Sequence, residues 1–200
     1  NMYHHYTADE HLLRAIGVLS EVEQGKATEE HPVAFELLSS GEIKRNVIYL
    51  AVLLHDIAKG RPEDHSIAGA RIARRLGPRL GFTKAETRLT EWLVREHLVM
   101  SDVAQRRDLS DPRTIEDFAA AVQTTERLKH LLVLTEVDIK AVGPGVWNGW
   151  KASLLGQLFV GAADVLTLGS DSASAREHDR SRESREAVGQ AVPEAHRAAF

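Results

Sequence analysis

The stretch that decides the fold is Leu50-Ala51-Val52-Leu53-Leu54-His55-Asp56-Ile57-Ala58-Lys59-Gly60, an apolar run that ends on a histidine and an aspartate. Its composition predicts a hydrophobic helix over residues 43–58, which Gly60 and Pro62 end. Burying an ionisable group costs several kcal/mol unless a partner compensates it. The chain repeats this arrangement where Asp138 closes the run Leu131-Leu132-Val133-Leu134. We therefore expect both acidic groups to meet a partner inside the fold.

Nearly every segment has the period of a helix, and hardly any alternates with a period of two, so we predict an all-α fold, a helical bundle. The capping box Thr7-Ala8-Asp9-Glu10 opens the first helix, and Gly77-Pro78 predicts a break or a kink. The predicted helices cover residues 7–23, 32–41, 43–58, 64–80, 83–97 and 115–122, a long helix that opens at Thr124 or Thr125 and carries Asp138, and residues 147–168.

Length and composition favour one domain with an appendage. A chain of 200 residues that is 43% hydrophobic buries one good core. We assign residues 1–168 to that domain and residues 169–200, which are rich in Ser, Arg and Glu, to a polar linker or lone helix that leads to absent C-terminal domains. A formal charge of -4 disfavours nucleic acid as a partner. No secretory segment or uninterrupted apolar span is present, so we expect a soluble, cytoplasmic protein without a membrane partner.

Histidines and aspartates recur on helix faces that are otherwise apolar, which is how a helical protein builds a metal site. Because the chain has no cysteine, its metal ligands must be His, Asp or Glu. The dipeptide alone is weak evidence, since His178-Asp179 repeats it among charged residues. We interpret His4, His5, His31, His130 and His196 as surface or packing residues. The candidate ligands are His11, His55, Asp56, His65, His97 and Asp138.

The order of His11, His55-Asp56 and Asp138 resembles that of the HD superfamily of metal-dependent phosphohydrolases. Longer strings over about the first 165 residues resemble the HD domain of the bifunctional uridylyltransferase/uridylyl-removing enzymes of bacterial nitrogen regulation. These strings are Tyr6-Thr7-Ala8-Asp9-Glu10-His11, Arg95-Glu96-His97-Leu98-Val99-Met100-Ser101, Ala104-Gln105-Arg106-Arg107-Asp108 and the segment of residues 138–151.

The resemblance implies hydrolysis of a phosphodiester, the removal of UMP from a tyrosine of the PII signalling protein. It implies that His11, His55, Asp56 and Asp138 hold one divalent ion and that His65 and His97 help to hold another. Asp56 would bridge the two ions. Mn is our first choice, with Fe, Co, Zn or Mg as alternatives. The nucleotidyltransferase and ACT domains of that family are absent from this sequence, so uridylyl transfer is not expected of it.

Basic residues near these motifs are candidates for phosphate or partner contact. Lys59 lies one turn beyond His55, and we expect it to act with Asp56 in catalysis. Looser candidates are Lys140, Arg106, Arg107 and Lys151.

Three other functions remain open at this point. The domain could hydrolyse a free nucleotide, such as a cyclic dinucleotide or guanosine tetraphosphate. It could use two irons to activate oxygen, or it could be a metal-free regulatory module. Metal analysis, turnover of generic phosphodiesters and iron-dependent oxygen uptake separate these functions.

Overall fold

The computed structural model describes residues 7–169, and within them the fold is all-α, as predicted. The linker or lone helix expected over residues 169–200 lies outside this range except for Gly169. His4, His5, His178-Asp179 and His196 lie outside it too. The helices are α1 (Ala8–Glu23), α2 (Pro32–Ser39), α3 (Arg45–Leu54), α4 (His65–Arg79), α5 (Lys84–Glu96), α6 (Val99–Arg106), α7 (Pro112–Val122) and α8 (Thr125–Ala141), followed by a helix at Gly149–Gly169.

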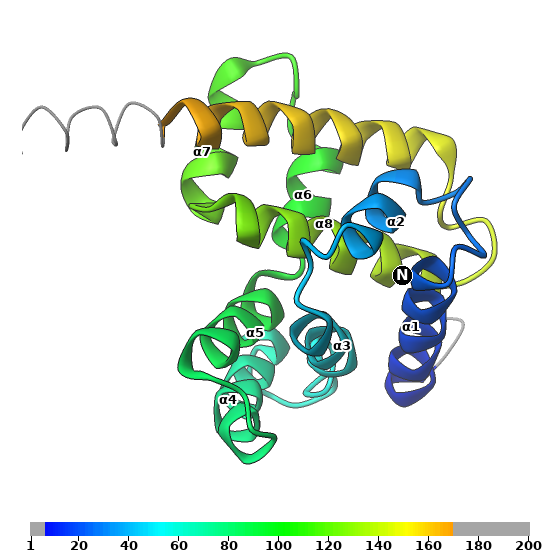
Figure 1. Ribbon diagram of the computed structural model, residues 1–200, viewed down its shortest axis with the longest axis vertical. Helices are drawn as coiled ribbons and strands as arrows, with labels where there is room; N and C mark the ends of the chain where they lie inside the picture. The colour runs from blue at the N-terminus through cyan, green and yellow to red at the C-terminus, as the bar shows by residue number, and fades with distance from the viewer. Residues whose placement is uncertain (1–6, 170–200) are drawn as a thin grey trace, which may run out of the picture.

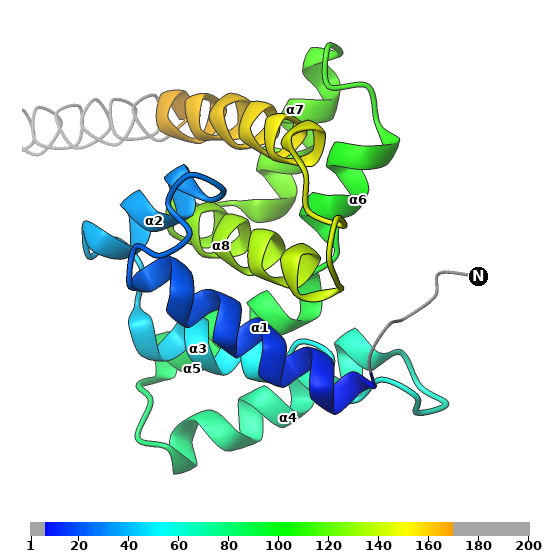
Figure 2. The same cartoon turned by 90° about the vertical axis from the view of Figure 1, so that its right-hand side faces the viewer.

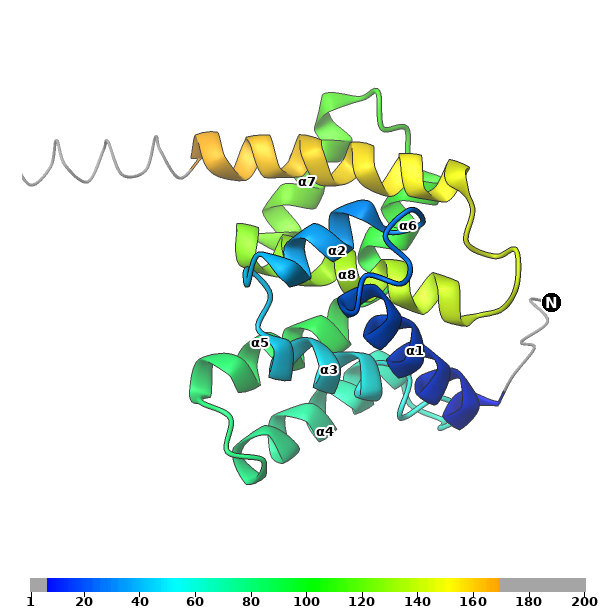
Figure 3. The same cartoon turned by 45° about the vertical axis from the view of Figure 1, so that its right-hand side comes forward.

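Helix α8 lies at the centre of the bundle. It contacts α1, α3 and α5 on one side and α2, α6 and α7 around the remainder. Figures 1, 2 and 3 show α8 between the α1, α3, α4 and α5 group and the Gly149–Gly169 helix. Accordingly, α8 is buried over almost its whole length, including the run Leu131–Leu134 that the sequence singled out.

Helix α3 ends earlier than predicted. The sequence predicted a helix over residues 43–58, but α3 stops at Leu54, and residues 55–60 form successive turns. The Ile57 and Lys59 amides donate to the carbonyls of Leu54 and Asp56, each three residues earlier, which replaces the α-helical pattern of bonds to the fourth residue back. The prediction was wrong because the apolar run continues through Ile57 and Ala58 and so hides the end of the helix.

Three other boundaries differ from the sequence-based prediction. Gly77-Pro78 does not break α4, which continues to Arg79. The prediction contained no helix between residues 97 and 115, where the structure has α6. Helix α7 begins at Pro112, since Asp111 caps it by accepting a hydrogen bond from the Arg113 amide.

The Gly149–Gly169 helix is long and apolar enough, by length and composition alone, to cross a membrane, and no other helix within residues 7–169 is. The sequence has no uninterrupted apolar stretch of this length, so no such helix was predicted. The Leu155, Leu158 and Ala162 side chains of the Gly149–Gly169 helix are buried in the same hydrophobic core as α8. One face of the helix therefore packs against the bundle, while Trp150, Val160 and Leu168 are exposed.

Small residues let α4 approach α3 and α5 closely. A Cβ added at Gly69 would lie 2.9 Å from Val94 Cγ1 on α5 and 3.3 Å from the Leu54 carbonyl oxygen at the end of α3. Val94 is fully buried and branched at Cβ, so it has little freedom to move away. Gly69 therefore fixes the distance between the helices that carry His55, His65 and His97.

We predict that Gly69→Ala destabilises the fold by about 1–3 kcal/mol, because overpacking outweighs the gain in helix propensity. Gly17→Ala on α1 is the matched control, since an added Cβ there meets nothing within 4 Å. The control should be stabilised by up to about 1 kcal/mol. Urea unfolding measures both changes, and equal stabilisation of the two variants would disprove the close approach.

Candidate metal centre

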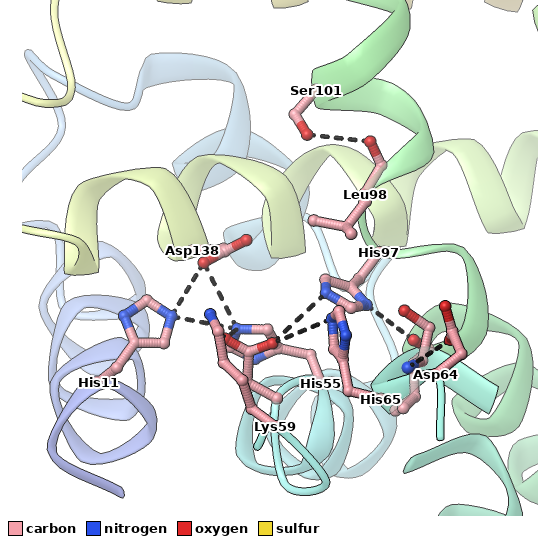
Figure 4. A network of polar contacts seen from close by, with 12 residues as sticks. His11, His55, Lys59, Asp64, His65, His97, Leu98, Ser101 and Asp138 are labelled. Carbon is pink, nitrogen blue, oxygen red and sulfur yellow. Dashed lines mark hydrogen bonds and ion pairs between the residues drawn. The ribbon is translucent and has the colours of Figure 1, made fainter. Parts of the chain in front are cut away.

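The structure brings all of the predicted ligand residues to one place, although they come from five helices or helix ends. His11 lies in the first turn of α1, His55 and Asp56 follow α3, and His65 begins α4. His97 follows α5, and Asp138 lies on α8. Figure 4 shows the four histidines and Asp138 converging between α1, α8 and the ends of α3 and α5.

One group of ligand atoms surrounds the His55 ring. His11 Nε2 lies 3.2 Å from His55 Nε2 and 2.9 Å from Asp138 Oδ1. His55 Nε2 lies 3.4 Å from the same Asp138 oxygen and 3.9 Å from Asp56 Oδ2. Two imidazole nitrogens that face each other and a carboxylate are three electron-pair donors, a set that a cation satisfies.

A second group shares Asp56 with the first. Its other oxygen, Oδ1, lies 3.4 Å from His65 Nε2 and 3.7 Å from His97 Nε2. In the first group, one ligand atom each from His11, His55 and Asp56 lie within 4.8 Å of one another. The same holds in the second group for one ligand atom each from Asp56, His65 and His97. The two oxygens of one carboxylate thus face two separate sets of imidazoles.

Backbone carbonyls orient the two most deeply buried rings. His55 Nδ1 is 2.8 Å from the Val52 carbonyl oxygen, and His97 Nδ1 is 2.8 Å from that of Val94. A carbonyl oxygen can only accept, so Nδ1 carries the proton in both rings. Each ring therefore presents Nε2 to the centre, the arrangement usual for histidines that ligate metals.

Electrostatics keep the centre ready for a cation. Burial acts to raise the pKa of the Asp138 and Asp56 carboxyls, but nearby groups outweigh it and lower the pKa of both. For Asp138 these groups are His55 and His11. For Asp56 they are His55 and Lys59. Burial and the adjacent His55 lower the pKa of His97 to about 4, so its ring is neutral at physiological pH. Burial also acts to lower the pKa of His55, but the attraction of Asp138 outweighs it and raises that pKa.

Residues 8–138 match the family model of the HD domain. The chain belongs to the HD domain family. It is 61% identical over 170 residues to the bifunctional uridylyltransferase/uridylyl-removing enzymes of Nitrobacter winogradskyi, Bradyrhizobium diazoefficiens and a further Bradyrhizobium strain, BTAi1. The match covers 84% of this chain but only 18% of each relative. Family and relatives together class this HD domain as a metal-dependent hydrolase.

The centre of the HD domain opens into a cleft of about 830 Å³. His11, Asp56, His65, His97 and Asp138 line it, together with Lys59, whose ammonium donates to Asp56 Oδ2 over 2.7 Å. Of the looser basic candidates, Arg106 and Lys151 line the cleft. Arg107 and Lys140 do not, and Lys140 pairs with Glu30 instead.

Sequence reasoning missed two supports of the centre. Asp64 caps α4 by accepting hydrogen bonds from the Ser66 and Ile67 amides, which fixes the first turn that carries His65 (Figure 4). An aspartate directly before a predicted helix is typical of an N-cap, and this pattern could have identified Asp64 from the sequence.

The other missed support is a buried pair that includes a residue of α8, the helix that carries Asp138. His31 Nδ1 lies 2.7 Å from Glu136 Oε2, and the His31 ring stacks on Trp147 with 4.7 Å between ring centres. Trp147 donates from Nε1 to the Glu30 carbonyl oxygen over 3.2 Å. His31 and His130 are packing residues, as predicted, and His31 in addition ties α2 to α8 and to the loop after α8. A glutamate two residues after the apolar run of α8 was the available signal.

We predict that a divalent cation stabilises the HD domain, because the converging ligands are otherwise buried without full compensation. At a Mn concentration a hundredfold above the Kd, the gain should be about 2.7 kcal/mol, which corresponds to a rise of roughly 5–10 °C in Tm for a chain of this size. Differential scanning calorimetry with Mn and with a chelator measures the shift. The same Tm under both conditions would rule out an internal site.

Proposed function

We propose that this HD domain hydrolyses a phosphodiester, and that its substrate is the UMP ester of a tyrosine on a PII signalling protein. The observation that carries the proposal is the position of Asp56, whose two carboxylate oxygens face two imidazole groups in the cleft. A pair of cations that share one carboxylate is typical of sites that transfer or hydrolyse phosphate esters.

In this proposal His11, His55, Asp56 and Asp138 hold one cation, and Asp56, His65 and His97 hold a second. A bound divalent cation lowers the pKa of water toward neutrality and neutralises charge on phosphoryl oxygens. Mixed imidazole and carboxylate ligands favour a first-row transition ion over Mg, and we propose Mn. Fe, Co and Zn satisfy the same ligands.

The protein's own groups position the ester. The Lys59 ammonium lies at the rim of the centre with its side chain 37% exposed, so it can reach a phosphoryl oxygen while Asp56 holds it in place. As a point charge it offsets the negative charge of the phosphodiester. The exposed guanidinium of Arg106 and the Lys151 ammonium line the same cleft and provide further positive charge for phosphate or partner contact.

The leaving group of this reaction needs no proton from the protein in order to depart. A tyrosine phenol has an ordinary pKa of about 10, so its phenolate departs more readily than an aliphatic alkoxide. This agrees with a centre whose ionised carboxylates are ligands rather than proton donors. We therefore assign no separate general acid.

The relatives are named for both uridylyltransferase and uridylyl-removing activities, and this chain spans 18% of their length. We assign it the uridylyl-removing activity alone. We propose that in the complete protein it is joined to nucleotidyltransferase and ACT domains, and that it acts in the cytoplasm.

We predict that Asp56→Ala lowers the rate of UMP release from uridylylated PII protein by at least about a hundredfold in Mn, because the shared ligand is lost. Chromatography of released UMP measures the rate, and circular dichroism checks that the variant is folded. Asp164→Ala is the matched control, since Asp164 is an exposed aspartate on the Gly149–Gly169 helix. The control should keep the wild-type rate.

Equal rates in wild type and Asp56→Ala would refute the assignment of the centre. Rapid hydrolysis of cyclic dinucleotides or guanosine tetraphosphate, with no release from uridylylated PII, would refute the substrate and favour the free-nucleotide function.

A further inference from the structure

One face of α6 lines the cleft beyond the metal centre. Leu98, Ser101, Asp102, Gln105 and Arg106 all border it, and their spacing of three and four residues places them on a single helix face. The opposite face of α6 is buried through Met100 and Ala104. The polar face of α6 therefore lies toward a bounded cleft that begins at His97.

Apolar side chains line the cleft as well. Ile139 and Val142, at the end of α8, and Val146, in the following loop, line it. Lys151 holds that loop by donating to the Val146 carbonyl oxygen over 2.7 Å. A cleft lined both by apolar side chains and by hydrogen-bonding groups suits a planar heterocyclic base.

The order of groups along α6 matches the order of groups in a nucleotide. Figure 4 shows Leu98 next to His97 and Ser101 beyond Leu98, so the stripe starts at the metal centre and leads away from it. A helix rises about 1.5 Å per residue, which puts Gln105 about 10 Å along the axis from Leu98. That length is comparable with the reach of a nucleoside monophosphate from phosphorus to the far edge of its base. With phosphate at the metal centre, ribose would lie beside Ser101 and Asp102, and the base beside Gln105.

The chemistry of these side chains fits uridine. A carboxylate such as Asp102 accepts hydrogen bonds from ribose hydroxyls, and Arg106, 3.5 Å away, orients it. The exposed amide of Gln105 has no hydrogen-bond partner within residues 7–169. It offers one donor and one acceptor in a plane, as the O4 and N3–H edge of uracil requires.

We propose that the cleft face of α6 is the nucleoside subsite of this domain and that Gln105 reads the edge of the uracil base. The proposal rests on the proposed function, because it assumes that a nucleotide phosphate sits at the metal centre. It adds a residue that determines specificity, distinct from the residues that hold cations or phosphate.

The test compares three 4-nitrophenyl phosphodiesters: those of uridine 5′-phosphate, cytidine 5′-phosphate and methyl phosphate, which carries no base. The proteins are the full 200-residue chain in Mn, Gln105→Glu, and the control Gln157→Glu, which changes an exposed glutamine outside the cleft. Glutamate has the shape of glutamine but cannot donate to uracil O4, whereas it still accepts from the amino group of cytosine.

In Gln105→Glu, the ratio of kcat/KM for the uridine ester to that for the methyl ester should fall about tenfold, as expected for one lost hydrogen bond of about 1.4 kcal/mol. The cytidine ester should become the better nucleoside substrate, and the control should keep the wild-type ratios. A general structural effect of the substitution would slow the three esters equally, and that result would overturn the subsite. Unchanged ratios would overturn it too.

Calorimetric binding of UMP and of inorganic phosphate separates the subsite from the proposed function. Wild type should bind UMP more tightly than phosphate, and Gln105→Glu should lose about tenfold in UMP affinity only. If wild type hydrolyses no ester, the proposed function fails, while this difference in binding still supports the subsite. Equal affinities of wild type for UMP and phosphate would overturn the subsite, whatever the rates.

Discussion

The interaction on which this structure depends is the one between the buried Asp56 carboxylate and the imidazoles on either side of it. Asp56 is 4% exposed and His55 is fully buried. Such groups are costly to desolvate, so the fold must deliver partners for them from elsewhere in the chain. It does so with α1, α4, α5 and α8. Their packing around α3 is therefore also the assembly of the metal centre.

Packing and chemistry constrain each other at several positions. Gly69 sets how closely α4 approaches α3 and α5, and through this it sets how closely the ligands at the ends of those helices converge. The carbonyls that orient His55 and His97 are those of Val52 and Val94, which are both buried core residues. The same residues thus stabilise the core and aim the ligands, so the rigidity of the centre follows from that of the bundle.

Much of the fold and of the centre could be predicted from the sequence, because the signals were local. The capping box at Thr7 gives the start of α1, the helix predicted over residues 83–97 matches α5 closely, and apolar periodicity places ligands on inward faces. The end of α3 could not be predicted, since its apolar run continues into the turn. Helix α6 and the cleft could not be predicted either. The polar face of α6 borders a cleft that forms only once α8 and the following loop have packed near it.

The central claim is that Asp56 joins two cations, and crystals grown in Mn test it most directly. Anomalous diffraction at the Mn absorption edge locates each ion independently of the protein model. We expect two peaks, one on each side of the Asp56 carboxylate, with His11, His55 and Asp138 around one and His65 and His97 around the other. No peak within coordinating distance of Asp56, or a single peak that leaves His65 and His97 without an ion, would contradict the account.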